Sequence, residues 1–183
     1  MISTKPVFLT GFMGAGKTKI GGILASRLCR KFLDTDNLIE VREGKSISRI
    51  FSEDGEVYFR ELEYECIKEV CKGKKSVVAL GGGAIVESRN LDLVCQKGIL
   101  VCIQATVDTI LSRIERRDDR PLLSGLDRKA KREKICEMLA DRAPFYERAQ
   151  LTVKSEKDSI PENTVTELIY LLEQSCENRM CKN

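Results

Sequence analysis

The segment GFMGAGKT, residues 11–18, constrains the fold of this chain more than any other stretch of the sequence. Its spacing is G-x-x-x-x-G-K-T, and it follows the short apolar run VFL and precedes a helical pattern. The three glycines let the backbone curl so that successive N–H groups point at phosphate oxygens, and the positive end of the helix strengthens the attraction. We therefore predict a phosphate-binding loop in which Lys17 reaches the β- and γ-phosphates of a nucleotide and the Thr18 hydroxyl coordinates Mg²⁺.

Apolar runs and helical periodicities alternate along the rest of the chain. Strands are expected at residues 6–10, 31–36, 76–80, 99–104 and 150–154. Helices are expected at residues 17–30, 37–43, 46–52, 55–72, 88–97, 107–117, 128–142 and 161–175. Since strands that alternate with helices are joined by right-handed crossovers, this order indicates an α/β fold with a five-stranded parallel sheet between two layers of helices.

The length and composition fit one globular domain, residues 1–183, with 42% apolar and 32% charged residues. The sequence has no run of about 18 apolar residues and no basic segment leading into an apolar one at its start. We therefore predict neither a membrane span nor a secretory signal, and we expect a cytoplasmic protein. The residues from about 176 to 183 are expected to form a frayed tail.

Cysteine and histidine usage narrows the possible chemistry. The sequence has eight cysteines, no C-x-x-C spacing and no histidine, which excludes the usual mixed Cys/His zinc sites. Six of the cysteines fall within helical or strand patterns, namely Cys29, Cys66, Cys71, Cys95, Cys102 and Cys136. We therefore interpret the cysteines as reduced thiols that act as small apolar residues. Without histidine, acid–base chemistry must fall to a carboxylate, a lysine or the substrate itself.

The stretch DTD follows the second expected strand. If Asp34 and Asp36 both lie at the end of that strand, their side chains point the same way, because strand residues two apart share a face. One carboxylate could steady the water shell of a metal ion and the other could meet an acceptor hydroxyl. The alternative is an acidic pair that only caps the following helix.

The stretch FRELE lies on the long helix expected at residues 55–72. Glu56 and Glu63 stand four residues before and three residues after Arg60. Surface helix pairs of this kind are common and contribute about 0.3–0.5 kcal/mol. The functional alternative is that a glutamate orients Arg60 so that its guanidinium binds a carboxylate through two hydrogen bonds.

The stretch LGGGA follows the third expected strand, where many phosphate-binding-loop proteins carry an aspartate for Mg²⁺. Three successive glycines, residues 81–83, bring bare backbone close to a ligand. We interpret them as a wall for a small, polar, ring-like substrate.

A lid is expected to begin with RPLLSG at residues 120–125. It could bring Arg120 to the transferring phosphoryl group and exclude water. Further along the chain, Arg142 precedes Pro144, which should end or kink its helix.

Taken together, these stretches resemble the shikimate kinase family, small kinases of aromatic amino-acid biosynthesis. The resemblance covers the chain from about residue 7 to the closing helix. Its motifs, in the family's order, are GFMGAGKT at 11–18, FLDTD at 32–36, FRELE at 59–63, LGGGA at 80–84, RPLL at 120–123 and RAPFYE at 142–147. The resemblance implies a fold akin to nucleoside monophosphate kinases, with a lid at about 118–129 and a substrate-binding region at about 34–62.

The resemblance also implies a reaction, the transfer of the γ-phosphoryl group of MgATP to the 3-hydroxyl of shikimate, which gives shikimate 3-phosphate and ADP. The implied catalytic residues are Lys17, Asp36 and Arg120. The implied shikimate-binding residues are Asp36, Phe51, Phe59, Arg60, Gly82, Gly83 and Arg142. The implied ATP-binding residues are Gly14, Ala15, Gly16, Lys17, Thr18, Lys19, Arg113 and Arg120, with a further contact around residues 157–159. The implied Mg²⁺ ligands are Thr18 and, through water, Asp34.

Three other functions compete with this interpretation. Another small-molecule or nucleotide kinase, such as a gluconate or adenylate kinase, is disfavoured by LGGGA and by the surroundings of Arg60. A regulatory module that has lost catalysis would be expected to lack Lys17, Asp36 or Arg120, and all three are present. A nucleic-acid binder could use the basic segment 113–134, but no aromatic residue interleaves its charges and the net charge is only +3. We therefore expect small-molecule partners, no nucleic acid, no membrane and a monomer, while Asp36 as the proton acceptor stays open.

Overall fold

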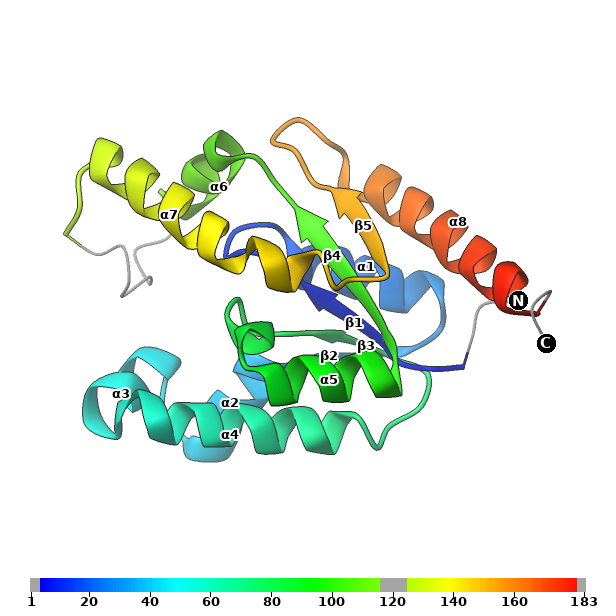
Figure 1. Ribbon diagram of the computed structural model, residues 1–183, viewed down its shortest axis with the longest axis horizontal. Helices are drawn as coiled ribbons and strands as arrows, with labels where there is room; N and C mark the ends of the chain where they lie inside the picture. Colours follow the sequence, from blue (N-terminus) through cyan, green and yellow to red (C-terminus); the bar gives the residue numbers. More distant parts are fainter. Residues whose placement is uncertain (1–3, 116–124, 181–183) are drawn as a thin grey trace.

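The computed structural model describes residues 4–115 and 125–180, and for residues 177–180 only the backbone. Its five strands are β1 (Val7–Thr10), β2 (Lys31–Asp34), β3 (Ser76–Ala79), β4 (Ile99–Gln104) and β5 (Leu151–Lys154). They form one sheet in the order β2-β3-β1-β4-β5, and every neighbouring pair is parallel. The predicted five-stranded parallel sheet is confirmed (Figure 1).

Helices fill the connections between the strands (Figure 1). They are α1 (Lys17–Arg27), α2 (Thr35–Glu43), α3 (Ile47–Glu53), α4 (Gly55–Val70), the short 3₁₀ helix η1 (Ala84–Val86), α5 (Ser88–Lys97), α6 (Val107–Ile114), α7 (Arg128–Tyr146) and α8 (Pro161–Met180). Their order agrees with the sequence periodicity, apart from η1, which was not predicted. The substrate-binding region expected at about 34–62 corresponds to α2, α3 and the first half of α4.

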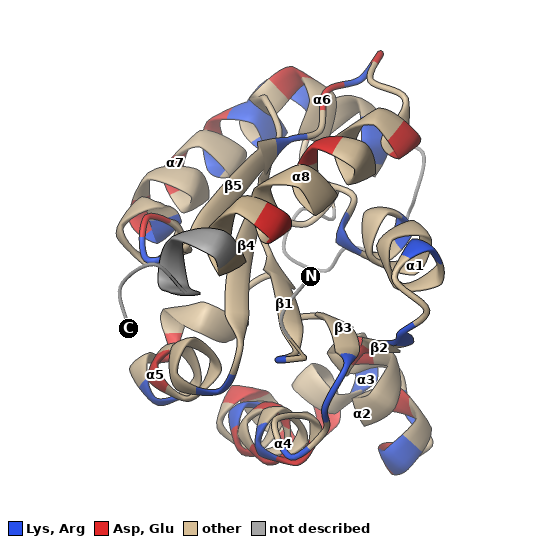
Figure 2. Cartoon of the chain, turned by 90° about the vertical axis from the view of Figure 1, so that its right-hand side faces the viewer, with Lys and Arg blue, Asp and Glu red and all other residues tan. Residues whose placement is uncertain are grey.

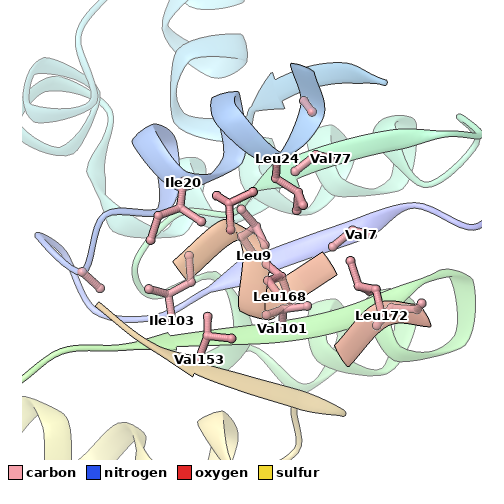
Figure 3. Packing of buried hydrophobic residues seen from close by; sticks show 14 residues of the cluster. Val7, Leu9, Ile20, Leu24, Val77, Val101, Ile103, Val153, Leu168 and Leu172 are labelled. Carbon is pink, nitrogen blue, oxygen red and sulfur yellow. The ribbon is translucent and has the colours of Figure 1, made fainter. Parts of the chain in front are cut away.

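The core lies on both faces of the sheet, as the alternation of β1 shows. Val7 and Leu9 pack on one face with residues of α1 and α8, such as Leu24 and Leu168 (Figure 3). Phe8 packs on the opposite face, in a cluster contributed largely by α4, α5 and α7. Because both faces of the sheet are covered, its central strands β1, β3 and β4 are almost entirely buried.

The acidic stretch DTD departs from the strand interpretation. Strand β2 ends at Asp34, and Asp36 lies in the first turn of α2. The Asp34 carboxylate accepts a hydrogen bond from the Asp36 backbone N–H at 3.2 Å, which caps α2. The expectation that both side chains leave one strand in the same direction is therefore wrong, because the capping preference of aspartate starts the helix early.

Two helix ends also differ from expectation. Helix α7 does not end before Pro144 but continues to Tyr146. Proline removes only one backbone hydrogen bond here, while the following Phe145 and Tyr146 pack against a buried cluster that favours the helical path. Helix α8 runs to Met180, so residues 176–180, which we expected to be frayed, are helical.

The remaining sequence predictions concern the lid, the thiols and the membrane. Residues 118–124 of the expected lid lie outside the described residues, and α7 begins at Arg128, near the end of the expected lid, with Asp127 as its cap. All seven described cysteines are free thiols. No helix within residues 4–115 and 125–180 is long and apolar enough to cross a membrane.

Candidate active site

The phosphate-binding loop connects β1 to α1 at the carboxyl edge of the sheet. Gly16 precedes α1 with a positive φ of 102°, a conformation that glycine adopts without strain. A Cβ on Gly11 would lie 2.3 Å from the Ile103 carbonyl oxygen of β4, so only glycine fits where the loop passes this strand. The Lys17 ammonium donates to the carbonyl oxygens of Gly11 at 2.8 Å and Phe12 at 3.2 Å, which holds it against the loop.

A pair of oxygen ligands lies at the start of α1. The Thr18 hydroxyl donates to Asp34 Oδ2 at 2.8 Å, while Asp34 Oδ1 holds the start of α2. Among the described residues, no group of three or more acidic, histidine or cysteine side chains could hold a metal ion. One hydroxyl and one carboxylate still suit Mg²⁺, which prefers oxygen and usually takes most of its ligands from water and substrate phosphates. The donor set therefore fits the ion.

A cavity of about 510 Å³ extends from this loop to the end of β2 and to the connection after β5. Its donor side is lined by Gly14, Gly16, Lys17, Thr18, Lys19 and Arg113, together with Ser155, Lys157 and Ser159 from the connection after β5. Its acceptor side is lined by Asp34, Asp36 and Gly82. The cavity therefore joins the phosphate-binding loop to the predicted acceptor carboxylate.

Gly81 is the point where two carboxylates of the acceptor side converge. A Cβ at this position would lie 2.7 Å from Asp36 Oδ1 and 2.8 Å from Glu63 Oε1. The Gly81 backbone N–H also donates to the buried Thr35 hydroxyl at 3.0 Å, which fixes the loop to the start of α2. A side chain at the first glycine of LGGGA would therefore displace the carboxylates of Asp36 and Glu63, which pack closely against the backbone here.

Two arginines from different helices meet at Gly83. Its Cβ position lies 3.6 Å from the Arg60 guanidinium of α4 and 3.7 Å from the Arg142 guanidinium of α7. Arg142 donates to the Gly82 carbonyl oxygen at 2.9 Å, and the Tyr146 hydroxyl donates to the same oxygen at 3.3 Å. The structure thus brings together residues 82 apart in the sequence, next to the second and third glycines of the motif.

Arg60 is held by two glutamates of its own helix. Its guanidinium contacts Glu56 at 3.0 Å and Glu63 at 2.8 Å, and the Glu63 side chain is only 1% exposed. Burial raises the pKa of the Glu63 carboxyl, with a further contribution from Asp36, although Arg60 acts in the opposite direction. Burial also lowers the pKa of Arg60, but Glu63 and Glu56 outweigh it and raise that pKa overall, so Arg60 stays charged. Because Glu63 is buried, the Arg60–Glu63 ion pair differs from an ion pair on the exposed surface of a helix.

The two predicted aromatic residues lie beneath Arg60. The Phe51 and Phe59 rings are 4.6 Å apart between centroids, and the Arg60 guanidinium carbon lies 5.3 Å from the Phe59 centroid. Phe59 is buried in a cluster with Ile39, Ile50 and Cys66. Neither phenylalanine lines the 510 Å³ cavity, so in this structure Phe59 contacts Arg60 and Phe51 packs against Phe59.

Arg113 links three parts of the donor side. Its guanidinium donates to the Gly14 and Ala15 carbonyl oxygens at 3.0 and 3.2 Å. It also donates to the Ser155 hydroxyl at 3.2 Å and to the Glu156 carbonyl oxygen at 2.9 Å. Burial lowers the pKa of Arg113, since most of these partners are neutral oxygens.

The sequence analysis missed Ser155 and Glu156 as site residues. The Glu156 carboxylate accepts hydrogen bonds from the Thr106 and Thr109 hydroxyls, both at 2.9 Å, which ties the connection after β5 to the start of α6. The one indication was the nucleotide contact around 157–159 that the family resemblance implies. Arg120 lies outside the described residues.

The parallel sheet, the phosphate-binding loop and the adjoining carboxylate and arginine groups define a P-loop kinase. The comparisons with known proteins make this more specific, because the shikimate kinase family model matches residues 13–173. This chain belongs to the shikimate kinase family.

Individual relatives agree with this assignment. Shikimate kinase of Chlorobium chlorochromatii is 42% identical over 92% of this chain and 90% of its own, and that of Geobacter metallireducens is 40% identical over 93% of each. The shikimate kinase structure from Acinetobacter baumannii, in complex with shikimate, has a TM-score of 0.88 at 34% identity, with 94% of this chain and 95% of that chain covered. A gluconokinase from Sinorhizobium meliloti covers 100% of this chain and 99% of its own, with a TM-score of 0.60 at 14% identity, which shows a shared fold alone.

Proposed function

We propose that this protein transfers the γ-phosphoryl group of MgATP to the 3-hydroxyl of shikimate and releases shikimate 3-phosphate and ADP. The observation that carries the proposal is the convergence of Arg60 and Arg142 at Gly83, beside the Asp36 carboxylate. Two guanidinium groups suit one substrate carboxylate, and a nearby acidic residue suits the hydroxyls of the ring. The family assignment supports the same acceptor.

On the donor side, we assign the phosphates to the backbone N–H groups of residues 14–18 and to the Lys17 ammonium. The ammonium already lies inside the loop, 2.8 Å from the Gly11 carbonyl oxygen, so little rearrangement separates it from a bound phosphate. Thr18 and Asp34 would hold Mg²⁺, which when bound neutralises charge on the β- and γ-phosphates. Lys19, Arg113 and the residues near 155–159 would contact the rest of the nucleotide.

On the acceptor side, Arg60 and Arg142 would bind the shikimate carboxylate while Asp36 meets the 3-hydroxyl. Glu63 keeps Arg60 in place from a buried position, and Gly81 allows Asp36 to lie against the backbone. In this arrangement Asp36 can orient the hydroxyl and accept its proton as the oxygen attacks phosphorus. Positioning and charge stabilisation supply most of the rate enhancement in such transfers. Three expectations stay predictions. They are that Arg120 contacts the transferring phosphoryl group, that the protein is a monomer and that it is cytoplasmic.

The test is ADP release from MgATP by the purified protein, measured with shikimate and, as control acceptors, with gluconate and AMP. We expect release that depends on shikimate and exceeds both controls at least a hundredfold. Formation of shikimate 3-phosphate should match ADP one to one. ATP binding without shikimate-dependent release would mean that the donor site is correct and the acceptor is wrong.

A further inference from the structure

A second cavity, of about 300 Å³, lies at the opposite edge of the sheet from the phosphate-binding loop. It is lined by the first residues of β2 and β3, Lys31 and Ser76, and by residues of α2 and α4. It shares no lining residue with the 510 Å³ cavity described above. The two cavities are therefore separate sites, one at the carboxyl ends of the strands and the other at the amino ends.

The body of this second cavity is apolar. Leu33 of β2, Leu38 and Ile39 of α2, and Val70 of α4 contribute aliphatic walls. Gly73, in the turn after α4, adds no side chain of its own. A volume near 300 Å³ with walls of this kind falls at the lower end of the range for small-molecule sites.

One buried polar group in this cavity lacks a partner. The Ser76 side chain lines the cavity and its residue is only 3% exposed. Among the residues that the structure describes, none forms a hydrogen bond with the Ser76 hydroxyl. Buried hydroxyls are nearly always hydrogen-bonded, because leaving one unpaired costs about 1–3 kcal/mol. Ser76 therefore offers a donor and an acceptor to a bound molecule.

The polar groups around the cavity are predominantly basic. Lys31 and Lys74 line it and pair with no carboxylate in residues 4–115 and 125–180. Arg42 and Glu69 also line it, but they form an ion pair between α2 and α4 and so balance one another. Figure 2 shows basic residues on the connection from α4 to β3 and near the start of β2.

The remaining acidic group cannot cancel this positive charge. Burial raises the pKa of the Cys66 thiol to about 11, so it stays neutral near pH 7. The cavity therefore combines an apolar body, one unpaired hydroxyl and two lysines not engaged with carboxylates.

We propose that this cavity binds a small monocarboxylate with an apolar body the size of one aromatic ring. The ring would occupy the space between Leu33, Ile39 and Val70, and the carboxylate would meet Lys31, Lys74 and the Ser76 hydroxyl. The two lysine ammonium groups and one hydroxyl can satisfy one carboxylate. A polyphosphate would need more hydrogen-bond donors than this largely apolar cavity offers. The proposal is independent of the assigned kinase reaction.

The test is a titration of ¹⁵N-labelled protein with 3-phenylpropionate, followed by NMR. Saturating shikimate is present throughout, because Arg60 and Arg142 could bind another carboxylate. We expect saturable shifts of the amide signals of Leu33, Ile39, Val70 and Ser76. Shifts confined to residues 81–83 and 142, or no saturable shifts at all, would overturn the proposal.

Variants and a neutral analogue test the carboxylate contact. The double variant K31Q/K74Q should bind 3-phenylpropionate at least tenfold more weakly, and S76A severalfold more weakly. The matched double variant K129Q/K134Q, with the same charge change on α7, should bind as the parent does. The uncharged 3-phenylpropanamide should bind at least tenfold more weakly than the acid. Equal affinity of K31Q/K74Q and the parent, or of the amide and the acid, would reject a carboxylate site here.

Discussion

The donor half of the active site comes mainly from one continuous stretch of chain, whereas the acceptor half is assembled from four separate ones. Residues 11–18 form the phosphate-binding loop largely through backbone groups and glycine conformations. The acceptor half brings Asp36 of α2, Arg60 of α4 and Arg142 of α7 to the glycines at 81–83. We infer that the donor half depends on local backbone geometry, and the acceptor half on side chains that α2, α4 and α7 bring to one loop.

The arginine next to each half shows the same difference. Arg113 donates to carbonyl and hydroxyl oxygens of the donor half, and burial lowers its pKa. Arg60 contacts two carboxylates, which raise its pKa overall. Removal of Arg113 leaves neutral groups without a partner, while removal of Arg60 leaves a buried carboxylate without its counter-charge. The second loss costs more free energy.

The largest effect is expected from Asp36→Asn, which keeps the shape of the acceptor half and removes the carboxylate that we propose as its base. We expect kcat to fall by about 10²–10⁴-fold, the usual contribution of a general base, with the Kd for ATP unchanged. Steady-state kinetics and ATP titration measure the two quantities. The control is Asp92→Asn, an exposed aspartate that pairs with Arg148. Turnover of Asp36→Asn within threefold of the parent would remove Asp36 from the chemistry.

The next effect is expected from Arg60→Ala, which removes one of the two arginines that we propose bind the shikimate carboxylate. Shikimate binding should weaken by about 2–5 kcal/mol, because the substrate carboxylate loses a hydrogen-bonded charge partner. The KM for ATP should stay within twofold. Arg49→Ala is the matched control, since Arg49 makes a comparable i,i+4 pair with Glu53 on the exposed surface of α3. If both variants bind shikimate like the parent, Arg60 belongs to the surface pairs and the comparison fails.

A pH-dependent effect on stability follows from the buried Glu63. Its folded pKa is raised, so the native state binds more protons than the unfolded state between the two pKa values, and stability falls as pH rises through that window. Arg60→Ala removes the partner that opposes this shift. We expect the variant to lose about 1–3 kcal/mol at pH 7.5, and less at pH 5.5 where Glu63 can bind a proton.

Urea unfolding at the two pH values measures this difference. The double variant Arg60→Ala/Glu63→Gln should recover most of the stability lost at pH 7.5, because no charge is then buried without a partner. A loss that is equal at both pH values would show that Glu63 does not govern it.

The contrast between local backbone geometry and contacts between distant segments also explains which features could be predicted from the sequence. The sheet, the order of helices and the phosphate-binding loop depend on local periodicity and on one spaced motif, and the structure confirms them. The prediction that Asp34 and Asp36 both lie on the strand was wrong. Asp34 caps α2, and this capping competed with the strand pattern at the same residues. The expected end of α7 at residue 142 was wrong, because tertiary packing of Phe145 and Tyr146 outweighed one lost hydrogen bond.

Other features depend on how distant segments pack. The Arg113 contacts join the loop at 14–15 to Ser155 and Glu156, and no short motif records that proximity. The convergence of Asp36 and Glu63 at Gly81 depends on how α2 and α4 pack against the end of β3. Contacts of this kind can be predicted from the sequence only through resemblance to a family.

The smallest effect is expected from Arg113→Gln, which tests whether the donor half really depends on its backbone. The variant loses hydrogen bonds to four neutral oxygens, so we expect the KM for ATP to rise by about 5–30-fold, equivalent to about 1–2 kcal/mol. The KM for shikimate should change less than twofold, since Arg113 does not contact residues of the acceptor half. Arg27→Gln serves as the control, because Arg27 donates to one exposed hydroxyl, that of Thr166. A rise of several hundredfold for ATP would show that one side chain holds the donor half together, as side chains do on the acceptor side. An unchanged KM for ATP would show that residues 11–18 keep their geometry without it, because the loop conformation is set by its glycines.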